Sequence, residues 1–279
     1  MSIRWHAGLT QAQRFQKTVP ATMDNIADEL SVYLLKRLRE CVSIQRQTTT
    51  VHADLARSRS APPDGRLIVG IAGVPASGKS TLSQMIIDRI NAAARSSQSQ
   101  ADSPENALSS AIQMTTPSQP IAVYVGLDGW HLTRAQLDAF PDPKLAHDRR
   151  GAHWTFDGEG YVAFVKALRT PISDPQNPTS IVHAPSFSHE KKDPVFNSIH
   201  VHPYHRLVII EGLYTFLGIP PWSAASELMD ERWWVQIGED EAEKRLVLRH
   251  VRTGVAKDME EAIWRSREND APSECYSSS

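Results

Sequence analysis

The sequence has few cysteines, little net charge and no long hydrophobic run. Its 279 residues include only Cys41 and Cys275, which lie far apart and form no metal-binding or disulfide pattern, so we expect a reducing compartment. The formal net charge of −2 provides no basic field for nucleic acid and no polybasic signal for a membrane surface. No apolar run approaches the length of a membrane span. Nucleic acids and membranes are therefore not expected as partners.

The composition is that of an ordinary globular protein. Hydrophobic residues make up 41% of the chain and charged residues 22%. Arg4, Arg14 and Lys17 precede the first acid, Asp24, and this profile resembles a mitochondrial presequence. We expect no secretory signal. The cytoplasm is the expected compartment, and the mitochondrion is the alternative.

Residues 73–81 carry the strongest signal, because they match the pattern G-x-x-x-x-G-K-[ST] at every fixed position. The apolar residues 67–72 before them predict a buried strand, and residues 82–94 after them have helical spacing. The N–H groups of such a loop and of the following helix bind phosphate. The motif predicts that Lys79 reaches the β- and γ-phosphates and that the Ser80 hydroxyl ligates Mg²⁺. The expected nucleotide-binding residues are Gly73, Ala76, Ser77, Gly78, Lys79, Ser80 and Thr81.

Strands and helices alternate after this motif. We expect strands at 121–127, 180–187, 206–210 and 233–237, and helices at 132–140, 158–168, 240–252 and 258–268. Such alternation predicts an α/β fold with a doubly wound parallel sheet of the P-loop NTPase type. Residues 95–120 are rich in Ser, Gln and Pro and are expected to form a disordered insertion.

The region before the motif is expected to be helical. Thr22 is placed to cap a helix over 23–46, and an apolar stripe from Ile26 to Val42 follows one face of it. That stripe either covers the side of the main body or binds a partner, and the sequence leaves both open. The polar residues 48–65 indicate a linker.

Two acidic residues follow expected strands. Asp128 comes after the strand at 121–127, at the edge where open α/β sheets place their ligands. Its carboxylate is suited to accept a proton from an attacking hydroxyl, or Asp128-Gly129 is only a turn. Glu211 follows the apolar strand at 206–210, which is typical of a Walker B acid that holds Mg²⁺.

Basic residues gather on the helix at 240–252. Arg245 and Arg249 are suited to stabilise the charge of a phosphoryl group in transfer, which favours a mobile lid. The alternative is a solvated helix in which Glu241 pairs with Arg245.

The chain resembles the P-loop kinase superfamily that includes uridine kinase, phosphoribulokinase and bacterial-type pantothenate kinase, with a uridine-kinase-like branch of fungi and bacteria as the nearest likeness. The resemblance spans about residues 66–272. It is carried by residues 73–81, 127–132, 149–157, 184–189, 210–213 and 249–254. It implies an N-terminal helical extension and linker over 1–60 and a P-loop kinase domain over 61–279, with a helical lid at 240–270.

The resemblance also implies roles for single residues. Asp128 would be the catalytic base, Lys79 would hold ATP, Ser80 and Glu211 would organise Mg²⁺, and Arg249 would belong to the lid. Contacts to the phosphate acceptor are expected from His131, Arg150, Trp154, Phe156 and Asp157, and less strongly from Ser188 and His189. Each has a structural alternative: Trp154 and Phe156 in the core, and Asp157 as a helix cap.

The expected function is an ATP- and Mg²⁺-dependent kinase that phosphorylates a hydroxyl of a small metabolite. A uridine-like nucleoside is the first acceptor to consider, and pantothenate or a sugar derivative is the next. A non-catalytic nucleotide-binding module is the rival, since the strand that the family usually adds beside the nucleotide is not found after Pro272. A homo-oligomer stays open. A zinc site is not expected in the region that contains His183, His189, His200, His202 and His205, because no cysteine or acid completes a ligand set.

Overall fold

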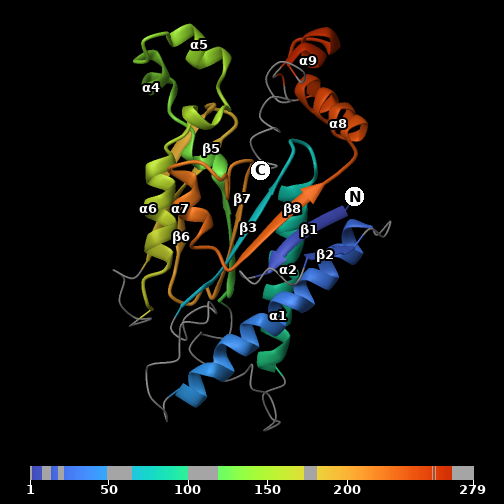
Figure 1. Ribbon diagram of the computed structural model, residues 1–279, viewed down its shortest axis with the longest axis vertical. Helices are drawn as coiled ribbons and strands as arrows, with labels where there is room; N and C mark the ends of the chain where they lie inside the picture. Colours follow the sequence, from blue (N-terminus) through green and yellow to red (C-terminus); the bar gives the residue numbers. More distant parts are fainter. Residues whose placement is uncertain are drawn as a thin grey trace.

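A six-stranded sheet in the order β2-β1-β8-β3-β7-β4 forms the centre of the molecule (Figure 1). A computed structural model describes residues 2–7, 14–17, 22–48, 65–99, 119–172, 181–252, 254 and 256–265. The parallel part of the sheet consists of β8 (Glu231–Gln236), β3 (Leu67–Gly73), β7 (Leu207–Glu211) and β4 (Ala122–Gly126). The sequence predicts each of these strands.

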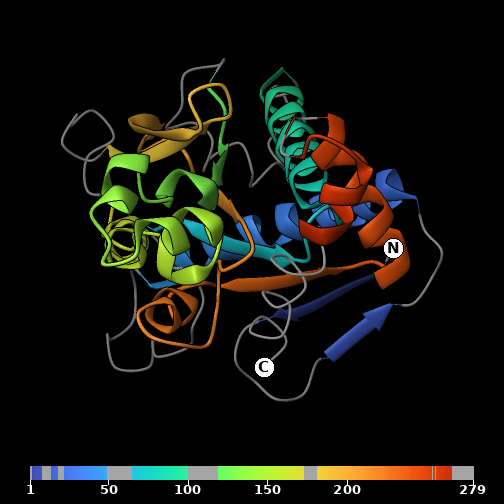
Figure 2. The same cartoon turned by 90° about the horizontal axis from the view of Figure 1, so that it is seen from above.

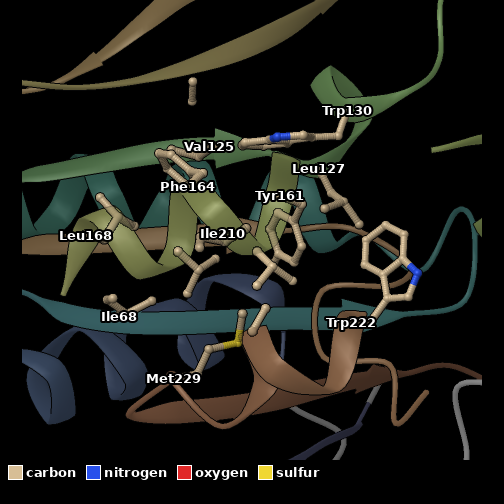
Figure 3. Close-up of a cluster of buried hydrophobic side chains, with 14 of the residues drawn as sticks. Ile68, Val125, Leu127, Trp130, Tyr161, Phe164, Leu168, Ile210, Trp222 and Met229 are labelled. Carbon is tan, nitrogen blue, oxygen red and sulfur yellow. The ribbon is translucent and has the colours of Figure 1, made fainter. Parts of the chain in front are cut away.

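Helices cover both faces of the parallel strands, as a doubly wound fold requires (Figure 2). On one face, α1 (Met23–Thr48) and α2 (Lys79–Ser99) pack on strand residues that include Val69 and Ile209. On the other face, α6 (Gly158–Leu168) and α7 (Trp222–Ser226) pack on Ile68 and Ile210 (Figure 3). Because successive strand side chains point to opposite faces, Ile209 and Ile210 contribute to different clusters.

The apolar stripe of helix α1 packs on the main body, which is the first of the two alternatives that the sequence leaves open. Its residues Leu30 and Leu34 are buried in the same cluster as α2. Arg89 of α2 donates to the carboxylates of Asp28 at 2.5 Å and Asp24 at 3.1 Å. The backbone N–H of α1's first turn bonds to the predicted cap, since Asn25 N donates to Thr22 Oγ1 at 3.3 Å. The part of the stripe at Cys41 and Val42 lies outside the described side chains.

Two strands occur near the N-terminus where the sequence predicts none. Strand β1 (Ser2–Ala7) pairs antiparallel with β8, and β2 (Arg14–Lys17) pairs with β1. Strand β1 therefore lies on the side of β8 that faces away from the phosphate-loop strand β3. The segment before residue 61 thus contributes strands to the main sheet as well as a helix.

The structure adds elements around the expected helix at 132–140. That segment forms a shorter helix, α4 (Arg134–Asp138), capped by Thr133, and a second helix, α5 (Pro143–Asp148), follows directly. Pro143 begins α5 because a proline is tolerated at the first helical position, where its missing N–H has no partner to lose. We call residues 132–150 the α4–α5 arm.

A separate two-stranded hairpin stands beside this arm. Strand β5 (Val182–Ser188) pairs antiparallel with β6 (Asp193–Val201), which the sequence does not predict. The short 3-10 helices η1 (Leu127–Trp130) and η2 (His153–Thr155) lie at the ends of the arm.

The remaining expectations concern the segments around the core. Helix α2 continues to Ser99, so the first residues of the expected insertion are helical, and residues 100–118 lie outside the described part, as does most of the linker at 48–65. Helices α8 (Glu239–Arg252) and α9 (Met259–Arg265) form the predicted lid region. Within the described residues, every helix is too short or too polar to cross a membrane.

Candidate active site

The phosphate loop connects the end of β3 to the start of α2, as predicted. Gly78 has a φ of +92°, which only glycine adopts readily, and an added Cβ would lie 2.7 Å from Cε of Met23 in α1. Ala76 also has a positive φ, of 59°. Ser77 is fully buried, while Ser80 and Thr81 are exposed in the first turn of α2. Helix α1 thus supports the loop from outside, and the start of α2 stays open.

Lys79 lies at the electrostatic centre of the predicted site. Its side chain is buried, and Nζ donates to the backbone oxygen of Val74 at 2.8 Å. Burial lowers the pKa of Lys79, the charges of Glu211 and Asp128 act to raise it, and that of Arg249 lowers it further. The structure therefore brings together four residues that lie far apart in the sequence.

Glu211 forms a polar cluster with Ser80 and Tyr124. Its Oε2 accepts hydrogen bonds from Ser80 Oγ and from the Tyr124 hydroxyl, each at 2.8 Å. Burial, together with the charge and hydrogen bond of Glu211, raises the pKa of Tyr124, so this phenol stays protonated and remains a donor. Tyr124 orients one carboxylate oxygen from β4, the neighbouring strand.

Asp128 occupies η1, directly after β4. Leu127 and Trp130 on either side of it are buried in the core, whereas 59% of its own side chain is exposed. A Cβ added to Gly129 would collide with the carbonyl group of Pro185, so the turn needs glycine to pack on the hairpin. The Asp-Gly turn is real, and it also presents the carboxylate to solvent at the edge of the sheet.

His131 packs beside Asp128 in a neutral form. Its Nδ1 lies 2.8 Å from the backbone oxygen of Asp128, and because a carbonyl only accepts, Nδ1 carries the proton. The imidazole stacks on Phe156, with ring centroids 3.9 Å apart, and lies 5.1 Å from the ring of Phe187. Burial lowers the pKa of His131 despite the opposing effect of Asp128.

Arg150 is held by several partners. It donates to Asp193 Oδ1 at 2.9 Å and to the backbone oxygens of Leu132 at 2.9 Å and Lys192 at 2.6 Å. Its guanidinium also lies over the ring of Phe187. Asp193 comes from β6, a strand that the sequence does not predict.

The other expected acceptor contacts differ in burial. Trp154 is 38% exposed and lies near the ring of Phe140, whereas Phe156 is buried against Tyr214 and Trp222. Asp157 caps α6, because its Oδ1 accepts from Gly160 N at 2.8 Å. Phe156 therefore belongs to the core and Asp157 caps a helix, as the structural alternatives predict. Contact of either residue with an acceptor stays a prediction.

The two weaker expectations, Ser188 and His189, lie at the end of β5. Ser188 Oγ accepts from Lys191 N at 3.2 Å, and the exposed His189 lies edge-on to the ring of Phe187. Nearby, His183 faces His200 across the hairpin with ring centroids 4.9 Å apart. Within the described residues, no group of three or more metal-binding side chains is placed to hold an ion.

The lid helices rise at the same end of the sheet as the α4–α5 arm, on the opposite side of β3 (Figure 1). Arg249 is exposed on α8 and acts electrostatically on Lys79. Arg245 instead pairs with Glu241 at 2.7 Å, as the solvated-helix alternative predicts. Arg249 is therefore the better placed of the two arginines to act on a phosphate at Lys79.

Comparisons with known proteins identify the family. No protein-family model matches the chain. It is 47% identical over 144 residues to an ATP-dependent kinase-like protein, notR', of Aspergillus versicolor, which covers 52% of this chain and 82% of the relative. It is 33% identical over 205 residues to a candidate uridine kinase of Schizosaccharomyces pombe, which covers 74% and 75% of the two chains. The chain belongs to the P-loop kinase family.

A solved structure confirms the fold of this P-loop kinase. The crystal structure of YFH7 from Saccharomyces cerevisiae, described as a candidate P-loop kinase with a circular permutation, has a TM-score of 0.66. The two structures match over 91% of this chain and 94% of the YFH7 chain, with 21% sequence identity. At that identity, the likeness concerns the fold alone.

Sequence reasoning missed two polar residues at the site of this kinase. Tyr124 lies in a predicted strand, but spacing alone does not show which of its side chains reaches the next strand. Asp193 follows Lys191 and Lys192 in a turn, where an acid looks like ordinary surface. Both were missed because their partners, Glu211 and Arg150, come from distant parts of the chain.

Proposed function

We propose that this kinase transfers the γ-phosphoryl group of ATP to a hydroxyl of a small polar metabolite. The observation that carries the proposal is the position of Lys79, which is buried and lies within electrostatic reach of Glu211, Asp128 and Arg249. An acid, a second acid and an arginine around a phosphate-loop lysine are the groups that phosphoryl transfer requires. The kinase names of the relatives support ATP as the donor.

The phosphate loop would bind the tail of ATP. The N–H groups at the start of α2 are directed at the site, where the helix dipole favours an anion. Lys79 would exchange its hydrogen bond to Val74 for phosphate oxygens, whose negative charge would offset the effect of burial, which lowers the pKa of its amine. Arg249 would add positive charge when the lid closes, because an arginine pairs well with phosphoryl oxygens.

The oxygens of Ser80 and Glu211 fit a magnesium ion. Ser80 Oγ and Glu211 Oε2 are 2.8 Å apart, and hydroxyl and carboxylate oxygens are ligands that Mg²⁺ prefers. Tyr124, as a donor to the same carboxylate oxygen, would orient it. A bound Mg²⁺ would neutralise negative charge on the phosphates.

Asp128 would act as the base. Its exposed carboxylate accepts the proton of the acceptor hydroxyl while the hydroxyl oxygen forms a bond to the γ-phosphorus. The bond between that phosphorus and the bridging oxygen breaks, and ADP leaves with the bond electrons. Neutral His131 donates to the backbone of Asp128, which leaves the carboxylate free for this role.

A uridine-like nucleoside is the first acceptor to test. His131, beside Asp128, lies 5.1 Å from the ring of Phe187, and Trp154 is partly exposed. Aromatic side chains of this kind suit a planar base. The name of the Schizosaccharomyces pombe relative supports the same choice. Pantothenate or a sugar derivative is the alternative acceptor.

The rival function is a nucleotide-binding module without catalysis. Lys79, Ser80, Asp128 and Glu211 favour catalysis.

A metabolite panel tests the proposal. ADP release is measured for wild type, for Asp128→Asn, and for the exposed Asp88→Asn on α2 as a matched control. We expect acceptor-dependent release that falls at least about 100-fold in Asp128→Asn, because a general base contributes that much, with little change in Asp88→Asn. No acceptor-dependent release from any metabolite would favour the binding module, and full activity of Asp128→Asn would remove Asp128 as the base.

A further inference from the structure

One carboxylate fixes both ends of the α4–α5 arm. At the start of the arm, Asp193 Oδ1 accepts from Arg134 N at 2.9 Å, and Oδ2 accepts from Arg134 Nε at 3.3 Å. At the end of the arm, Oδ1 also accepts from Arg150 Nη2 at 2.9 Å. Partial burial acts to raise the pKa of Asp193, but these hydrogen bonds lower it overall. Asp193 therefore stays ionised and ties the arm to the hairpin.

Hydrogen bonds within the protein use the terminal nitrogens of the Arg150 guanidinium. Its Nη1 and Nη2 groups donate to Lys192, Leu132 and Asp193, and 16% of the side chain is exposed. Its Nε atom is buried, so an incoming molecule does not reach it without movement. A guanidinium that is already paired with a carboxylate contributes little to the binding of a second anion.

The charges around His131 show what the acceptor side offers. Among the described residues, the charged or titratable groups that act on His131 are Asp128, Arg150 and His189. Arg150 is the permanent cation of the three, and Asp193 pairs with it as well as with Arg134. An anionic acceptor placed here would meet the carboxylate of Asp128, while the terminal N–H groups of Arg150 are already bonded to other partners.

We propose that Asp193 is a specificity-determining residue: by occupying the guanidinium of Arg150 and fixing both ends of the arm, it makes the site select an uncharged acceptor over an anionic one. The inference rests on the proposed kinase function and narrows its acceptor class to neutral, hydroxyl-bearing molecules such as nucleosides and unphosphorylated sugars. It disfavours carboxylated and phosphorylated acceptors.

Matched pairs of acceptors test this selectivity. Each pair keeps a primary hydroxyl and differs mainly by one anionic group: uridine with uridine 3′-monophosphate, pantothenamide with pantothenate, and gluconamide with gluconate. We expect wild type to have the higher kcat/KM for the neutral member. Asp193→Asn frees the guanidinium of Arg150, so the preference for the neutral member should fall about 10-fold, the value of one charge-assisted hydrogen bond.

Two further variants separate charge from structure. Arg150→Gln removes the cation, so it should weaken turnover of the neutral member without a gain for the anionic one. Asp148→Asn makes the same chemical change on the same arm, at an exposed residue that pairs with Lys144, and should keep the wild-type preference. A purely structural role for Asp193 predicts equal losses for both members of a pair, and this result would overturn the proposal.

Binding measurements keep the two proposals distinguishable. Dissociation constants for each pair, measured with a non-hydrolysable ATP analogue, do not depend on turnover. Wild type that binds the anionic member more tightly, or Asp193→Asn with an unchanged ratio, would overturn the inference even if the protein is a kinase. Tighter binding of the neutral member by wild type, with a smaller difference between the two members in Asp193→Asn, supports the inference even if no phosphate is transferred.

Discussion

The phosphate loop comes from one consecutive stretch, residues 73–81, whereas the acceptor side is assembled from η1, the α4–α5 arm, η2 and the β5–β6 hairpin. The loop is shaped mainly by its backbone and by the packing of β3 and α2. The acceptor side depends on side-chain contacts between distant segments, such as Arg150 with Asp193. A continuous backbone motif keeps its geometry when neighbours change, and a site built from tertiary contacts changes with each of them.

The largest expected effect concerns the phosphate loop. In Lys79→Met the buried cation is lost, and with it the charge that stabilises the transferring phosphoryl group. We expect kcat to fall about 1000-fold with every acceptor, because one missing donor to a developing charge costs about that much. ADP release with neutral and anionic acceptors measures this. If kcat fell with neutral or with anionic acceptors only, the phosphate loop would also determine acceptor specificity, which contradicts the comparison.

This division also explains how much the sequence predicts. The strand, loop and helix around Lys79 follow from local pattern, and so do Glu211 at the end of β7 and Asp157 as the cap of α6. Thr22 and the helix that begins at Met23 follow from capping and periodicity.

Tertiary pairing accounts for what the sequence does not predict. Strands β1 and β2 are short and carry no clear alternation. Strand β1 is placed by pairing with β8, more than two hundred residues away, and β2 by pairing with β1. Strand β6 is mostly exposed and its apolar residues do not alternate regularly with polar ones, so no hydrophobic pattern marks it. Asp193 matters only because β6 places it beside Arg150.

The second prediction separates packing from recognition on the acceptor side. Phe156→Ala removes a buried ring between Tyr214 and Trp222 and should lower the free energy of unfolding by about 3–4 kcal/mol. Trp154→Ala removes a partly exposed ring and should cost about 1 kcal/mol or less, while raising the KM for the acceptor. Urea denaturation and steady-state kinetics on both variants check this. Equal losses of stability would mean that Trp154 belongs to the core.

The smallest expected effect is a dependence of stability on pH that comes from His131 on the acceptor side and from His205 in the turn between β6 and β7. Burial lowers the pKa of His205 to about 3, with further lowering by His202 and Arg66, and burial also lowers the pKa of His131. The unfolded chain binds these protons near pH 6.5, so the native state loses stability as the pH falls below that value toward 3. The slope is at most about 1.4 kcal/mol per pH unit for each histidine.

Unfolding by urea at pH 7 and at pH 5 measures this slope, with His205→Gln as the comparison. We expect the variant to be less stable at pH 7 and to lose less on acidification. The phosphate loop contains no histidine, so the affinity for a nucleotide should change less than stability does. If the free energy of unfolding fell equally with pH in wild type and in His205→Gln, His205 would not be the cause of the pH dependence.

The fate of a labelled γ-phosphate tests the central claim most directly. ATP labelled at the γ-phosphorus is incubated with wild type or Asp128→Asn and the best neutral acceptor of the panel, and the products are separated. The account predicts that wild type moves the label to the acceptor and that Asp128→Asn almost stops this transfer. Label released only as inorganic phosphate, or transfer that is equal in both proteins, would contradict it.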